Sequence, residues 1–81
     1  MKYKLKYEIE VDGKKVDELT LRRPTVSDIE QESKLETNVE KNMLYISNLA
    51  EISPDSVRKI DAVDYLALVD IVNGCFEKAK K

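Results

Sequence analysis

The stretch that decides the fold is ELTLRRPTVSDI, residues 18–29, in which a strand changes into a helix. Leu19 and Leu21 alternate with polar residues, a spacing typical of a half-buried strand. Pro24 lacks the N–H group that a strand donates to its neighbour, so the strand ends before it. Thr25 is followed three residues later by Asp28, nearly the spacing of a capping box, which indicates that a helix begins there.

The residues before this stretch predict the other half of a β-hairpin. The segment KYKLKYEIEV, residues 2–11, alternates between apolar and charged side chains, so we expect one face to be formed by Tyr3, Leu5, Tyr7, Ile9 and Val11. Asp12–Gly13 tolerates the positive φ angles of a tight turn between the two strands. Between Val16 and Leu19 the alternation slips by one residue, which predicts a β-bulge near Asp17–Glu18.

The residues after the joint predict helices. Their start signals are Thr25, Thr37, Ser53–Pro54 and Asp61. We expect Val26, Ile29 and Leu35 to form the buried side of the first short helix, and the last helix to extend to Ala79. The sequence therefore predicts an α+β fold in a single domain, residues 1–81, with a hairpin at 2–23 and three or four helices packed on it at 25–80.

The last helix has more apolar surface than one core needs. Its main stripe is Tyr65, Leu68, Val69, Val72 and Phe76, and Val63, Leu66 and Ile71 lie about 100° or more from it. In the preceding helix, Leu44 lies away from the main stripe, and Tyr45 at its flank is the one tyrosine considered for a contact surface, since Tyr3, Tyr7 and Tyr65 occupy core-facing positions. In a chain this small, we expect some of this surplus to contact a partner.

The residue types argue against catalytic and metal sites. The chain has no histidine and one cysteine, so a Cys–His pair is impossible and no common ligand set is complete. The carboxylates between residues 28 and 40 are spaced so that they scatter around a helix surface. We therefore predict no catalytic, metal or cofactor-binding residue, no cofactor, and a protein that is not an enzyme.

The charge pattern argues against nucleic acid as a partner. The formal net charge is −2, and residues 24–81 hold seven Lys and Arg against eleven Asp and Glu, whereas a nucleic-acid-binding element usually has a basic excess. The sequence has no apolar run long enough to span a bilayer and no signal-peptide pattern, so we expect no membrane partner. A single cysteine fits a reducing cytoplasm.

The two arginines of the joint have two interpretations. Arg22 and Arg23 have the forked donors that bind phosphate or carboxylate, so an anion or an acidic partner is one candidate ligand. The structural interpretation, in which one arginine pairs with Asp28 or Glu18, is favoured because no Gly-rich loop accompanies the pair. We expect the joint mainly to fix the angle between the hairpin and the helices.

Two longer stretches resemble the Mu-like phage tail assembly chaperone family of contractile-tailed phages and prophages. The first is DGKKVDELTLRRPTVSDI, residues 12–29, with its hairpin, its Leu-x-Leu-Arg strand and an aspartate at the start of the helix. The second is LAEISPDSVRKIDAVDYLALVDIV, residues 49–72, with a Ser-Pro turn followed by Asp-x-x-Asp-Tyr-x-x-Leu. Together they cover about half of the chain in matching order.

The resemblance implies an assembly factor that is absent from the mature virion. Such proteins are expected to bind the long tape-measure protein and to promote assembly of tail-tube protein around it, in the cytoplasm of the bacterial host. On this interpretation, the predicted partner contacts are Leu44, Tyr45, Leu66 and Ile71. A charge reversal at Ile71 is expected to abolish solubilisation of the tape-measure protein while the chain stays folded.

Other functions remain open at the level of the sequence. One is a small regulatory or antitoxin-like protein of a mobile element, which binds nucleic acid or a partner protein; Lys2, Lys4 and Lys6 are its nearest basic feature. Another is a self-assembling structural protein of the tail. Because a two-stranded hairpin has two open edges, self-association through those edges is a further expectation.

Overall fold

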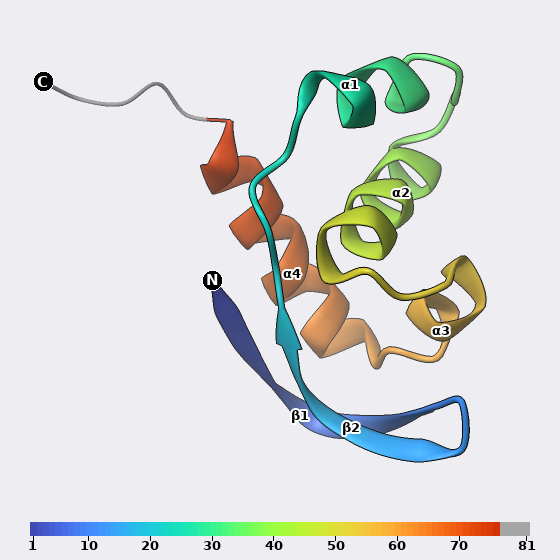
Figure 1. Cartoon of the computed structure of the whole chain (residues 1–81), viewed down its shortest axis with the longest axis vertical. Helices are drawn as coiled ribbons and strands as arrows, with labels where there is room; N and C mark the ends of the chain where they lie inside the picture. The colour runs from blue at the N-terminus through green and yellow to red at the C-terminus, as the bar shows by residue number, and fades with distance from the viewer. Residues whose placement is uncertain (77–81) are drawn as a thin grey trace, which may run out of the picture.

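The computed structural model describes residues 1–76. Two antiparallel strands, β1 (Lys2–Val11) and β2 (Lys14–Thr20), are followed by the helices α1 (Val26–Glu32), α2 (Asn38–Ala50), α3 (Pro54–Arg58) and α4 (Ala62–Cys75). The hairpin lies at one end of the molecule and α1 at the other (Figure 1). The predicted α+β fold of a hairpin followed by helices is confirmed, whereas the predicted extension of the last helix to Ala79 lies outside the described residues.

The core lies between the hairpin and the three later helices. Leu5, Ile9, Leu19 and Leu21 from the hairpin side join one apolar cluster with Tyr45, Ile46, Leu49, Val57, Ile60, Leu68 and Val72. Ile46, Leu49 and Leu68 have no exposed surface. Burying one such side chain stabilises the folded state by about 1.5–3 kcal/mol, so this cluster supplies the main driving force for folding.

The hairpin has a regular turn and an irregular middle. Asp12 and Gly13 have φ angles of 53° and 80°, as a type I′ turn requires. Lys4 lies opposite Glu18, but the next pair along the ladder is Ile9 with Val16. The extra residues therefore belong to β1, opposite Asp17, and not to β2. The sequence predicted a bulge near Asp17–Glu18. The irregularity lies opposite these residues, but it is in β1 and not in β2.

This irregularity explains an error in the predicted strand face. Leu5 and Ile9 are buried as expected, but Tyr7 between them is 57% exposed. The alternation of a regular strand would have placed all three side chains on one side. Because β1 departs from regular pairing between Lys4 and Ile9, Tyr7 turns outward while its neighbours stay in the core.

The carboxylate of Asp64 in α4 fills the gap that the irregularity leaves in the ladder. The backbone N–H groups of Lys6 and Tyr7 donate to it at 3.0 and 3.1 Å, and the hydroxyl of Tyr3 donates at 2.8 Å. Asp64 has no exposed surface. Burial alone raises the pKa of this carboxyl, but the three hydrogen bonds and the charge of Lys6 outweigh it, so the pKa lies below its ordinary value.

The predicted helix starts are confirmed. Thr25, Thr37, Ser53 and Asp61 are the residues that precede α1, α2, α3 and α4. Thr37 and Glu40 form a reciprocal capping box at the start of α2. At the end of α2, Glu51 adopts a left-handed backbone with a φ of 57°, which lets the chain turn sharply towards Pro54.

Helix α1 buries a charged residue instead of an apolar side. Asp28 is the one residue of α1 that is buried, whereas Val26 and Ile29 are 80% and 46% exposed. The prediction that Val26 and Ile29 form a buried side was wrong. The helix is attached to the rest of the molecule by hydrogen bonds to its carboxylate, so its apolar residues are left outside.

We expect Asp64→Ala to lower the free energy of unfolding by about 3 kcal/mol, because the variant leaves three donors of β1 without their shared acceptor. Chemical unfolding of the purified variant measures this loss. Asp70→Ala is the matched control, since Asp70 is exposed on the same helix; its free energy of unfolding should change by about 0.5 kcal/mol or less. Equal losses in the two variants would contradict the role assigned to Asp64.

Candidate functional site

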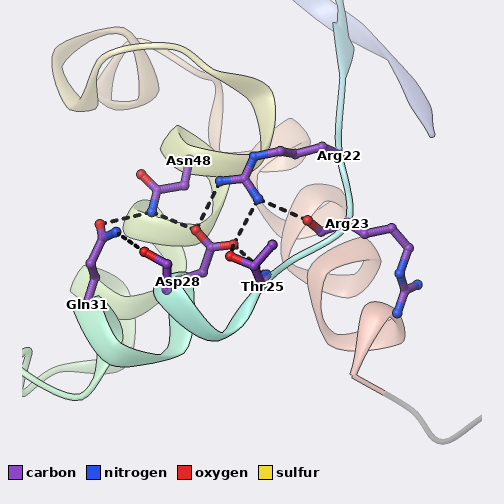
Figure 2. Close-up of polar contacts among 7 residues, drawn as sticks. Arg22, Arg23, Thr25, Asp28, Gln31 and Asn48 are labelled. Carbon is purple, nitrogen blue, oxygen red and sulfur yellow. Dashed lines mark hydrogen bonds and ion pairs between the residues drawn. The ribbon is translucent and has the colours of Figure 1, made fainter.

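The joint between β2 and α1 is built around the buried carboxylate of Asp28 (Figure 2). The Arg22 guanidinium donates to both carboxylate oxygens, at 2.9 and 3.0 Å. The backbone N–H of Thr25 donates at 2.8 Å, and the side-chain amide of Asn48 in α2 donates at 3.1 Å. Asp28 thus connects the end of the hairpin, the start of α1 and the last turn of α2.

These donors set the charge state of the joint. The Arg22 side chain, more than any other group, holds the pKa of Asp28 far below its usual range, against the opposing effect of burial. The same pair raises the pKa of Arg22. Both groups stay charged at neutral pH. The sequence predicted that one arginine pairs with Asp28 or Glu18, and the structure has Arg22 paired with Asp28.

Arg23 points in another direction, towards the end of α4. Its guanidinium donates to the carbonyl oxygen of Cys75 at 3.2 Å. A cation at the C-terminal end of a helix is favourable because the last carbonyl groups carry partial negative charge. The protein's own groups therefore account for both arginines. A contact of Arg22 and Arg23 with an external anion or acidic partner stays a prediction.

Apolar side chains meet polar ones in a cleft between α1, α2 and α4. This α1–α4 cleft has a volume of about 540 Å³ and is lined by Ile29, Glu32, Asn38, Lys41, Asn42, Tyr45, Val72, Asn73 and Phe76. Ile29 from α1 and Phe76 after α4 are 46% and 44% exposed at this cleft. Tyr45 packs edge-to-face against Phe76, with 5.1 Å between ring centroids. Burial, and to a lesser degree the nearby charge of Glu32, raises the pKa of Tyr45.

A second apolar surface lies on the outside of α4. The exposed residues of this helix, which we call the outer face of α4, are Ala62, Val63, Leu66, Asp70, Asn73 and Gly74. Val63 and Leu66 are 50% and 62% exposed, and Asp70 is the one charged residue of the face. Asn73 also lines the α1–α4 cleft. The outer face and the cleft are therefore continuous.

The predicted contact residues lie in different surroundings. Leu66 is exposed on the outer face of α4, and Leu44 is half-buried in a hollow of about 440 Å³ beside Leu35, Met43 and Pro54. Ile71 is also half-buried and packs against the core. Tyr45 is 5% exposed. Its ring lies at the α1–α4 cleft together with Val72 and Phe76. A partner contact at each of the four residues stays a prediction.

Sequence reasoning missed two apolar residues of the cleft. Ile29 was assigned to a buried helix side and Phe76 to the main stripe of α4, yet nearly half of each side chain is exposed. One signal in the sequence points to this result. Asp28 is the third helical residue after Thr25 and follows Arg22 closely, so it can turn inward, and its neighbour Ile29 then points about 100° away around the helix.

Two further features concern residues 1–76. Within this part of the chain, no group of three or more His, Cys, Asp or Glu residues is arranged to hold a metal ion. Among the helices described here, none combines the length and the apolar composition needed to cross a membrane.

A family model described as "Phage tail assembly chaperone proteins, E, or 41 or 14" matches residues 2–77, almost the whole chain. No curated protein and no solved structure matches the chain.

The Arg22–Asp28 pair predicts how the stability of the folded chain depends on pH. Because the folded-state pKa of Asp28 is depressed, its contribution to stability is complete above about pH 5 and decreases as the pH falls through and below its unfolded pKa of about 4. Asp28→Asn should lower the free energy of unfolding at pH 7 by about 2 kcal/mol, since it breaks a charged pair. It should also weaken the dependence of stability on pH between about 5 and 2.

Urea unfolding at a series of pH values measures both effects. Asp55→Asn is the matched control, because Asp55 also pairs with an arginine, Arg58, at 2.7 Å but is exposed. That variant should follow the wild-type curve. An Asp28→Asn curve parallel to that of the wild type would show that Asp28 does not carry the acid sensitivity.

Proposed function

Since the chain belongs to the phage tail assembly chaperone family, we propose that it binds the tape-measure protein and keeps it soluble while tail-tube subunits assemble around it. It acts by binding and not by catalysing a reaction, and it does so in the cytoplasm of the bacterial host. The observation that carries the proposal is the exposed apolar surface on the outer face of α4. The alternative of a nucleic-acid-binding regulator finds no support in the acidic helical part.

The shape of this surface favours a helical partner. Val63 and Leu66 are three residues apart on one side of α4, so an amphipathic helix can lie along them with its own apolar stripe. The surface continues through Asn73 to Ile29 and Phe76 at the α1–α4 cleft. A tape-measure protein is expected to be long and mostly helical, with apolar stripes that need such a cover.

The modest size of the surface fits a reversible contact. Val63 and Leu66 are accompanied by small or polar neighbours, so each chaperone molecule buries little apolar area against its partner. Many copies bound along one long partner gain effective affinity without a strong individual contact. Tube subunits, the other proposed partner, can then displace one chaperone at a time at a small cost in free energy.

The central test is Leu66→Asp, which places a charge in the middle of the outer face. Co-expressed with the tape-measure protein, the variant should bind it at least tenfold more weakly, the effect of about 1.4 kcal/mol. The amount of tape-measure protein in the soluble fraction should fall accordingly. The melting temperature of the isolated variant should be unchanged, because Leu66 is 62% exposed.

Val26→Asp is the matched control, since Val26 is an even more exposed apolar residue, at 80%, but belongs to α1. It should leave the tape-measure protein soluble. Ile71 is no longer a suitable position for this test, because it packs against the core and a charge there is expected to unfold the chain. Full activity of Leu66→Asp would reject the outer face as the site, and failure of the wild type would reject the function.

A further inference from the structure

The two edges of the hairpin differ in what covers them. In β1, the N–H groups of Lys6 and Tyr7 already donate to Asp64, and the Lys59 ammonium donates to the carbonyl oxygen of Glu10 at 3.4 Å. β1 is also interrupted between Lys4 and Ile9. β2 is continuous over Lys14–Thr20, and no element among the described residues adds a strand to its outer side. β2 is therefore the regular open edge of the sheet.

The space beside this edge is open along part of β2. A groove of about 380 Å³ lies between the second half of β2 and the end of α2, and its lining includes Leu19, Thr20, Ala50 and Ile52. The end of α2 thus does not fill the space next to β2. Unpaired N–H and C=O groups along such an edge readily accept a further strand.

The charges of β2 select which strand fits. Lys14 and Lys15 precede Val16, and Asp17 and Glu18 follow it. When two copies of this sequence run antiparallel with Val16 opposite Val16, each lysine lies opposite an acidic residue of the other copy. Lys14 then faces Glu18, and Lys15 faces Asp17, on both sides of the axis. The edge is therefore complementary to itself in charge.

We infer that the chain forms a homodimer in which the two β2 strands pair antiparallel about a two-fold axis at Val16, which joins the hairpins into a four-stranded sheet. The contact of Lys14 with Glu18 and that of Lys15 with Asp17 each occur twice, related by the two-fold axis, as in other interfaces between identical patches. The assembly closes at two copies, because β1 at each outer end is interrupted and bonded to Asp64.

Other alignments of the same strands are disfavoured. Moving the two-fold axis by one residue, from Val16 to its neighbour on either side, places Lys15 opposite Lys15 or Asp17 opposite Asp17. A parallel in-register pair places every charge opposite its own kind. Like charges directly opposite each other destabilise a sheet, so the charged edge excludes most pairings and permits this one.

Charge reversals at Lys15 and Asp17 test the inference, since both side chains are exposed and neither belongs to the core. Sedimentation equilibrium of the wild type should show a monomer–dimer equilibrium below about 1 mM. Lys15→Asp and Asp17→Lys each replace two attractions by two repulsions, so each should raise the dimer dissociation constant by about tenfold or more.

Two combinations should restore the dimer. The double variant Lys15→Asp/Asp17→Lys exchanges the charges and recovers both opposite pairs. An equimolar mixture of the two single variants should form a heterodimer, because every acidic residue of one chain then faces a lysine of the other. Glu8→Gln is a control for the exposed contact of Lys15 with Glu8 at 3.7 Å within the hairpin, and it should leave the dimer intact.

Several results would overturn the inference. They are a wild type that stays monomeric to about 1 mM, a dimer that is insensitive to both reversals, and variants that do not rescue each other. A monomer whose binding to the tape-measure protein is weakened by the reversals would assign the β2 edge to that partner, and would equally reject the dimer. None of these results depends on the outer face of α4, so the proposed function is tested separately.

Discussion

The hydrogen bonds between the Asp64 carboxylate and strand β1 determine how the two parts of this chain fit together. Three donors from β1 converge on one buried side chain at the start of α4. Without this acceptor, the N–H groups of Lys6 and Tyr7 would lose their hydrogen-bond partner within the protein. The irregular strand and the position of α4 therefore depend on each other, and Leu5 and Ile9 reach the core because of both.

Asp28 has the corresponding role at the other end of the molecule, and it influences the surface as well. Its bonds to Arg22, Thr25 and Asn48 attach α1 through one polar residue. Since this attachment uses the side of α1 that faces the core, Val26 and Ile29 stay outside. An apolar attachment would have buried them. The same attachment through Asp28, which we expect to be sensitive to acid, thus leaves Ile29 at the α1–α4 cleft.

Local signals in the sequence predicted much of the fold. The Asp12–Gly13 turn, the four helix caps and the pairing of one arginine of the joint with a nearby carboxylate all involve residues close in sequence, whose hydrogen bonds follow from residue type and spacing. The errors involve contacts over long separations. Asp64 bonds to Tyr7, 57 residues away, and nothing in the alternation of β1 indicates that a helix will supply an acceptor there.

The site was less predictable than the fold, for a related reason. Helical spacing gave the angular order of apolar residues on α4, and it correctly separated Leu66 from the core stripe. It could not tell which neighbour covers a given flank, so Tyr45 was assigned to the surface and Phe76 to the interior. Their edge-to-face contact, at 5.1 Å, depends on how α2 and α4 cross, which only packing determines.

The two proposed contacts use different elements, and this separation has a consequence for binding. The partner helix would lie on the outer face of α4, whereas the second copy would pair with β2, so neither occupies the residues that the other needs. A dimer therefore presents two outer faces to one long helical protein. Because the second contact forms within the same complex, its effective concentration is high, and two weak surfaces hold the partner more firmly than either alone. Displacement of one face at a time still permits stepwise release.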